Sequence, residues 1–416
     1  MRRIYLSIIL IGFTTFVKAQ TYTVTDLEQQ FLEKNYVLIA GKYNIAKADA
    51  EIVQEKLWPN PTLNISEVNL WKTYQIEEQP FLFGNYGNNQ QISIELEQLF
   101  ETAGKRKKRV AIKQLEKNSA VFNFEELMRH LKKELRVNYY TLNKIQTEET
   151  LLNSIVDLFT QMNSQYERQA ALKNIPTAEF YRVQTELIGL QKEKIELEKQ
   201  KTESLNKMRL LTQNPSLKIS QIVFSDLPFV SKQIPLNLND QAKDNNIGLQ
   251  RQLNETSIAQ NQLKLEKALR TPDLTFQVNY DRGGNIMRDF VGVGVSFDLP
   301  VLNTKKGAIK AAKHNIDQQI TQQQVLETEL TSTVNTLQEQ LQLMNQSLKN
   351  WSDIKTTEQE QMIENYKKHL KNKQITLIEF IDFTQAFREA QQAYLELLEN
   401  YHHTVEELNY LTGQEL

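Results

Sequence analysis

The sequence has no cysteine among its 416 residues, which excludes disulfides, thiolate metal ligands, a catalytic thiol and a lipid anchored on cysteine. Glycine (13 residues) and proline (9 residues) are scarce, so turn signals between the periodic segments are few. After the first twenty residues, no stretch approaches the roughly 20 consecutive apolar residues of a membrane-spanning helix. Any insertion into a membrane must therefore use strands.

The first residues are typical of a secretory signal peptide. A basic start is followed by an apolar run over 4–16 and by a small-residue site that ends at Ala19. We therefore expect residues 1–19 to be removed and the mature chain to begin near Gln20.

Motifs of enzymes and of nucleic-acid binding are also missing. The sequence holds no HExxH, phosphate loop, glycine fingerprint or nucleophile elbow. The net charge is −2, and it becomes −5 without the three leader cations Arg2, Arg3 and Lys18, which argues against nucleic acid. The five histidines are scattered, and the side chains of adjacent His402 and His403 diverge by about 100° on a helix. We expect no metal site, no cofactor and no catalytic residue.

An internal duplication of about 200 residues organises the chain. Residues 55–63 and 266–274 each lead from a helical pattern through proline into an alternating one. Further residues recur at a constant offset of 200, namely Tyr166, Ile175, Glu179, Phe180 and Leu211 at Tyr366, Ile375, Glu379, Phe380 and Leu411. The sequence therefore predicts two copies of one unit, over 20–220 and 221–416.

Each unit contains two segments in which apolar and polar residues alternate, as in strands with one apolar face. The expected strands cover about 61–70 and 90–99 in the first unit, and about 272–282 and 289–300 in the second. A soluble sandwich would show the same alternation. A sandwich normally needs about seven strands, whereas this chain offers four in two distant hairpins.

Long helical patterns follow each strand pair. We expect very long helices over about 103–170 and 304–370, each followed by a return helix, over about 176–213 and 376–412. Apolar residues in the first long helix are separated by three, four or seven positions, as in a coiled coil. About 65 residues at 1.5 Å each would make a rod of roughly 100 Å.

Four strands with open edges cannot cross a bilayer alone, because the edges would leave backbone groups unpaired in hydrocarbon. Several chains must share one barrel, and three chains give twelve strands and room for an aqueous lumen. The expected fold is mainly α with a small β part. It would be a trimeric 12-stranded transmembrane β-barrel, with four strands per chain, continued by a periplasmic α-helical barrel.

The signal peptide, the duplicated helix-strand-strand-long helix-helix unit and the hairpin positions resemble the TolC family of outer-membrane efflux proteins. The short length is similar to the CzcC-like branch associated with heavy-metal efflux. This resemblance implies a homotrimer in outer-membrane lipid of a Gram-negative bacterium, with its helical part in the periplasm. It also implies a periplasmic adaptor protein and an inner-membrane pump, commonly of the RND class. The chain would be a passive conduit for substrates such as divalent metal cations, and not an enzyme.

The resemblance places a periplasmic gate at the helix tips. The family's acidic tip positions match Glu379 and Asp382, and the first unit keeps only Glu179. A ring of these carboxylates from three chains would favour cations and raise the pKa of its members. On an ordinary helix, the same residues would be solvated surface charges.

Two turn segments between long and return helices are candidates for adaptor contact, and plain helix-helix turns are the alternative. They depart from the family pattern, because lysines stand where glycine is expected. The candidate residues are Lys173, Asn174, Ile175, Pro176, Lys373, Gln374, Ile375 and Thr376. Trp58 and Trp71 bracket the first strand, where interfacial aromatics of a membrane barrel would lie.

Three other functions stay open on the sequence. A secreted coiled-coil structural or adhesion protein would share the long helices and the repeat, but it has no need of amphipathic hairpins. A periplasmic adaptor would place glycine-rich strands around one helical hairpin. A soluble periplasmic enzyme would require a convergent polar cluster.

Overall fold

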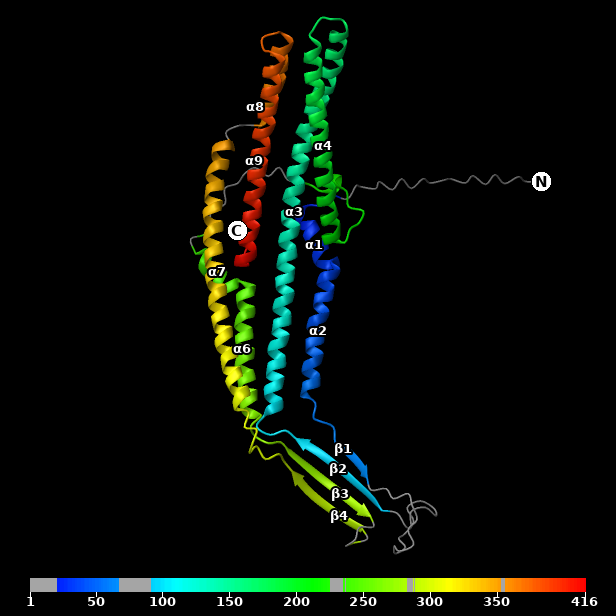
Figure 1. Ribbon diagram of the computed structural model, residues 1–416, viewed down its shortest axis with the longest axis vertical. Helices are drawn as coiled ribbons and strands as arrows, with labels where there is room; N and C mark the ends of the chain where they lie inside the picture. Colours follow the sequence, from blue (N-terminus) through cyan, green and yellow to red (C-terminus); the bar gives the residue numbers. More distant parts are fainter. Residues whose placement is uncertain are drawn as a thin grey trace, which may run out of the picture.

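The chain forms a long helical rod with a small β-sheet at one end (Figure 1). The signal-peptide residues, Trp71 and most of the first hairpin loop lie outside the residues that the structure describes. A computed structural model describes residues 21–66, 91–224, 235, 237–282, 287, 289–352 and 356–416.

Both repeats follow the same order of elements. The first contains α1 (Val24–Lys34), α2 (Tyr36–Lys56), β1 (Thr62–Ser66), β2 (Ile92–Phe100), α3 (Lys105–Ala171) and α4 (Thr177–Thr212). The short helix η1 (Ile219–Gln221) lies in the connection. The second contains α5 (Leu238–Asn245), α6 (Ile247–Ala268), β3 (Leu274–Arg282), β4 (Asp289–Ser296), α7 (Lys306–Ser352), α8 (Thr356–Lys371) and α9 (Leu377–Thr412).

Two features differ from the predicted elements. The helix that precedes each strand pair is divided, at Asn35 in the first repeat and at Asn246 in the second. The second long helix, expected over 304–370, is described as the two helices α7 and α8, and residues 353–355 between them are outside the described part.

The strands form one antiparallel sheet in the order β1-β2-β3-β4, so the hairpins of the two repeats meet at β2 and β3. The expected strand over 289–300 ends at Ser296, which pairs with Thr275 at the start of β3. Among the described residues, β3 begins at Leu274, opposite Phe297, so no described strand lies beside the residues that follow Phe297. Of the expected strand over 61–70, the part up to Ser66 is described.

The longest helix, α3, has 67 residues, which correspond to about 100 Å, and it packs against α1, α2, α4, α6 and α9. Three apolar clusters hold them together. One joins α1, α3 and α4, a second joins α5, α7 and α9, and a third lies towards the tips and joins α3 and α4 to α8 and α9. The tips of both helical hairpins lie at the end of the rod opposite the sheet (Figure 1). Among the described helices, none combines the length and the apolar character needed to cross a membrane.

Candidate functional site

The sheet presents one continuous apolar face. The register aligns apolar side chains across all four strands, as in the row formed by Leu63, Leu96, Val278 and Val293. These side chains are exposed, and Val293 reaches 84%. The opposite face carries polar residues and glycine, including the row formed by Asn64, Glu95, Asn279 and Gly292. In water such an apolar face costs free energy, so the arrangement indicates an apolar environment outside the chain.

The apolar surface continues past the end of β4. Phe297, Leu299, Val301 and Leu302 are all exposed, and Leu302 is 97% exposed. β1 and β4 are the edges of the sheet, because the strand order is β1-β2-β3-β4. An apolar sheet with two free edges is a template for pairing with another chain.

Trp58 lies between α2 and β1, where the sheet meets the helices, and its place at a membrane interface stays a prediction. It is 56% exposed and packs edge-on against Phe100 at 5.9 Å between ring centroids. Phe100 in turn packs against Phe276 at 5.3 Å, and the guanidinium of Arg106 lies 3.6 Å from the centre of the Trp58 ring. Trp58 therefore belongs to an aromatic row that ends at a cation.

A buried lysine fixes the helices to the sheet. Lys105, the first residue of α3, is 3% exposed, and its Nζ lies 2.7 Å from Oδ1 of Asp273. The same ammonium donates to the carbonyl of Thr271 at 2.6 Å, and the backbone N–H of Thr102 donates to Asp273 at 2.7 Å. These contacts join the end of β2 to the start of β3, which come from different repeats.

The two tip turns have the same backbone geometry, although both lack glycine. Lys173 and Lys373 occupy the left-handed region with φ of 60° and 58°. The N–H of Asn174 donates to the carbonyl of Gln169, and the N–H of Gln374 to that of His369, each at 2.9 Å. This is the Schellman closure of a helix, which usually uses glycine at the left-handed position. Both lysines thus occupy a turn position at which glycine is usual.

The predicted gate residues lie at the start of the return helices. Glu379 forms a capping box with Thr376, whose backbone N–H donates to the carboxylate at 2.7 Å. Hydrogen bonds from the backbone and the side chain of Thr376 lower the pKa of Glu379. Asp382 is exposed, while Glu179 is half-buried in the first turn of α4. In the single chain, Glu379 thus stabilises its own helix, and the role of these acids as a gate remains a prediction.

Two asparagines were missed by the sequence analysis. The side-chain oxygen of Asn35 accepts from the N–H groups of Val37 and Leu38, and its amide donates to the carbonyl of Leu211 at 2.9 Å. In the second repeat, the amide of Asn246 donates to the carbonyl of Leu411 at 3.1 Å. The two asparagines are 211 positions apart, as are Pro61 and Pro272, so aligning the chain with itself at that offset would have found them.

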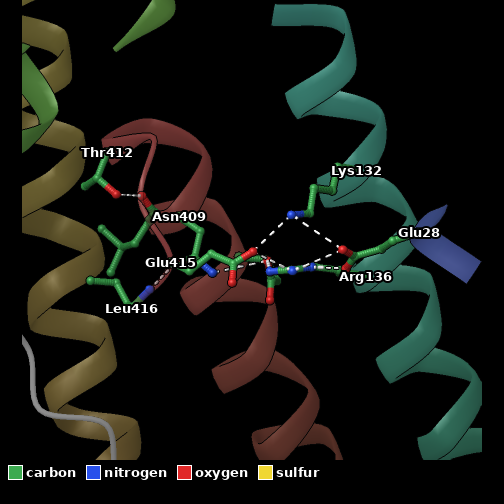
Figure 2. A network of polar contacts seen from close by, with 9 residues as sticks. Glu28, Lys132, Arg136, Asn409, Thr412, Glu415 and Leu416 are labelled. Carbon is green, nitrogen blue, oxygen red and sulfur yellow. Dashed lines mark hydrogen bonds and ion pairs between the residues drawn. The ribbon is translucent and has the colours of Figure 1, made fainter. Parts of the chain in front are cut away.

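A charged network joins the two repeats near the middle of the rod. Figure 2 shows Arg136 of α3 between Glu28 of α1 and Glu415, which follows α9. Lys132 lies 3.5 Å from Glu28 and 3.0 Å from Glu415. Arg136 also lies 3.3 Å from Glu406, whose side chain is 6% exposed. These charges are paired across the seam between α3 and α9.

Within the described residues, no group of three or more histidine, aspartate or glutamate side chains is placed to hold a metal ion. His402 stacks on Tyr140 with ring centroids 4.3 Å apart, and His403 lies 3.7 Å from Glu399. The adjacent histidines thus contact different partners.

No protein-family model matches the sequence, and no curated protein matches it in a sequence search. Solved structures do match over 94% of this chain. CusC, described for folding and transmembrane channel formation, is 12% identical over 92% of its own length, with a TM-score of 0.76. The outer membrane protein VceC of Vibrio cholerae is 12% identical over 96%, with a TM-score of 0.72. The MtrE outer membrane channel of Neisseria gonorrhoeae is 13% identical over 89%, with a TM-score of 0.72.

At these identities the likeness concerns the fold, and it extends over nearly the whole of each chain. The matched proteins are outer-membrane channels of the family that the repeat resembles. This chain has the fold of the TolC family of outer-membrane efflux channels.

Proposed function

We propose that the chain is one subunit of an outer-membrane channel, a passive conduit of an efflux system in a Gram-negative bacterium. The observation that carries this proposal is the exposed apolar face over four strands, with both edges unpaired in the described chain. A bilayer would cover that face, and copies of the chain would pair the edges. The helical rod would then extend into the periplasm.

Three copies would close the barrel. Two would give eight strands, whose side chains fill the interior, while three give twelve strands and a lumen. The contact between β2 and β3 provides the template for the contact between subunits, because the repeat relates β2 to β4 and β3 to β1. Within the chain, Gln98 of β2 pairs with Phe276 of β3. Residues of β4 follow their β2 counterparts by 201 positions, and residues of β1 precede their β3 counterparts by 211 positions. The same pairing between copies would therefore place Leu299 opposite Ile65 of the next copy.

The helices support the same assembly. Tyr181, Ile188 and Ile195 follow one another at seven-residue spacing on α4, and they are 58%, 61% and 69% exposed. At an offset of 200, Ile188 corresponds to Arg388 of α9, which contacts Glu186 and Glu193 of the first repeat. In a closed ring, the α4 stripe would therefore face the return helix of the second repeat, α9, in the next copy.

The tips at the far end of the rod are the surface for a periplasmic adaptor, which would link the channel to an inner-membrane pump of the RND class. Two turns of equal geometry, centred on Lys173 and Lys373, would give three chains six similar tips. Divalent metal cations are the proposed substrates on the resemblance to the CzcC-like branch. A wall of this kind requires no catalytic residue.

A disulfide between subunits tests the barrel. The natural chain has no cysteine, so the double variant Ile65→Cys with Leu299→Cys carries only the designed pair. Directly opposite residues in an antiparallel pair have Cα atoms about 4.5–5.5 Å apart, within the range of a disulfide. Within one chain, Ile65 lies three strand spacings, about 14 Å, across the sheet from Val291, and Leu299 lies eight residues further along the chain, which prevents an internal bond.

Oxidation in native membranes should give covalent dimers and trimers and nothing larger. The control pair Ile65→Cys with Val295→Cys lies four residues out of register, and it should stay monomeric. Products that stop at dimers would indicate an eight-stranded assembly. Purely monomeric product from the matched pair, in a chain that extracts with water, would refute the channel proposal.

A further inference from the structure

The long helices begin with dense positive charge beside the sheet. Residues 102–113 contain six lysines and arginines and no acidic residue, and residues 303–313 contain four lysines and no acidic residue. Both stretches lie at the ends of α3 and α7 that adjoin the sheet. We refer to six of these residues as the cationic belt: Arg106, Lys107, Lys108, Lys305, Lys306 and Lys310.

The cationic belt places positive side chains at the helix ends that already carry partial positive charge. The N-terminal end of a helix carries partial positive charge and favours aspartate or glutamate. Neither α3 nor α7 has an acid in its first turn, whereas α1, α4 and α9 have Asp26, Glu179 and Glu379 there. α2 and α6 lack such an acid as well, but the long helices add lysines and arginines at this end, and an anion from outside the helices would offset this positive charge.

The belt adjoins the face that the proposed barrel turns to lipid. Phe276 and Phe100 lie on that face, Trp58 packs on Phe100, and Arg106 lies over Trp58. In the second repeat, the fully exposed Leu302 is followed three positions later by Lys305. Apolar surface thus gives way to cations within a few residues, as at the boundary between acyl chains and headgroups.

Part of the local positive charge is already neutralised. Lys105 pairs with Asp273, and Arg109 pairs with Glu55 and Glu101. Lys107, Lys306 and Lys310, in contrast, are exposed and form no ion pair with any residue in the described ranges. These three lysines are available to an anionic partner.

We propose that the cationic belt binds the phosphate groups of anionic phospholipids in the leaflet next to the helical rod. The inference rests on the proposed function, because only a barrel in a bilayer holds the belt at headgroup level. Lysine and arginine can lay their aliphatic stems along apolar surface while the charge reaches the headgroups. Each cation near an anionic surface adds attraction that weakens with salt.

The test compares two triple variants of the full chain. The belt variant is Lys107→Glu, Lys306→Glu, Lys310→Glu. The control variant, Lys207→Glu, Lys218→Glu, Lys243→Glu, makes the same charge change at exposed positions in and after α4 and in α5, away from the sheet and from the α4 stripe. Each protein is reconstituted in vesicles of phosphatidylcholine with one-fifth phosphatidylglycerol, and the lipids retained after gentle extraction are counted by native mass spectrometry.

Wild type and control should retain phosphatidylglycerol and phosphatidylcholine in a ratio about tenfold above that of the vesicle, and salt should reduce this enrichment. The belt variant should lose it. Enrichment that survives in the belt variant, or an absence of enrichment in wild type that is inserted, would overturn the inference and leave the channel intact. Failure of wild type to insert would instead refute the proposed function. A lysine-to-glutamine version of the belt variant, expected to lose most of the enrichment, covers the case in which charge reversal prevents folding.

Discussion

Replacing Asn35 by alanine should destabilise the middle of the rod more than a typical substitution at a helix end. Asn35 is 2% exposed, and it serves three helices at once. Its side-chain oxygen caps α2 through hydrogen bonds of 2.9 and 3.2 Å, and its amide donates to the carbonyl of Leu211 near the end of α4. Alanine removes the cap, which costs about 1 kcal/mol. It also leaves the Leu211 carbonyl without its donor, which costs about 1–3 kcal/mol.

The expected loss for Asn35→Ala is therefore about 2–4 kcal/mol, on the sum of these two effects. Asn35→Asp separates them, because the carboxylate keeps the cap but faces the Leu211 carbonyl without a donor. Asn246→Ala is the matched variant of the second repeat. Its side chain is only half-buried and accepts one cap bond, from Leu249 at 3.0 Å, so the cost should be smaller, about 1–2 kcal/mol.

Hydrogen exchange by mass spectrometry on the detergent-solubilised protein measures these differences locally. Faster exchange is expected in α1, the start of α2 and the end of α4 for Asn35→Ala, with little change in the second repeat. Asn246→Ala should show the mirror pattern in α5, α6 and the end of α9. Protection of α2 equal to wild type in Asn35→Ala, or an equal loss in both variants, would refute the reasoning from burial and hydrogen bonding.

Two further predictions concern carboxylates of the helical rod. Burial raises the pKa of Glu148 to about 7, opposed by Lys144 and reinforced by Glu396 and Glu399. The folded chain therefore keeps this proton to higher pH than the unfolded chain, and stability should fall as pH rises from about 4.5 to 7. Glu148→Gln should raise the unfolding temperature at pH 8 by an amount worth at most about 3 kcal/mol and change it little at pH 4; equal shifts at both pH values would contradict this. Thr376→Val removes the capping box of α9 and should cost about 1 kcal/mol locally, seen as faster exchange over 377–380. Thr177→Val is its control, because Pro176 precedes α4 without a side-chain cap, and an effect of equal size there would count against the capping role.

The repeat and the strand alternation predicted much of the architecture, because both depend on local periodicity. The end of β4 was not predictable in this way. The apolar alternation continues to Leu299, but a strand needs a neighbour, and β3 begins at Leu274. The length of β4 in one chain is thus decided by its partner strand and not by its own residues.

The site residues show the same difference between features that local sequence determines and features that depend on distant residues. The acid three positions after Thr376 is a capping box by sequence alone, yet the family resemblance favoured a gate for Glu379. Asn35 could not be assigned from its neighbours, because its amide partner is 176 positions away. Lys173 and Lys373 looked like a departure from the expected turn, and they adopt the left-handed conformation because the Schellman hydrogen bonds around them fix the backbone.

Because β1 and β4 are the edges of the sheet, insertion of the proposed barrel into the membrane depends on how many copies assemble. A lone subunit that entered the bilayer would carry two rows of unsatisfied peptide groups into oil, and adding one copy would only move those rows apart. These peptide groups become hydrogen-bonded only when the last free strand edge pairs with the first and the ring closes. For the proposed barrel, partial rings should therefore be rare in the membrane, and assembly should pass from separate chains to closed barrels with few stable species in between.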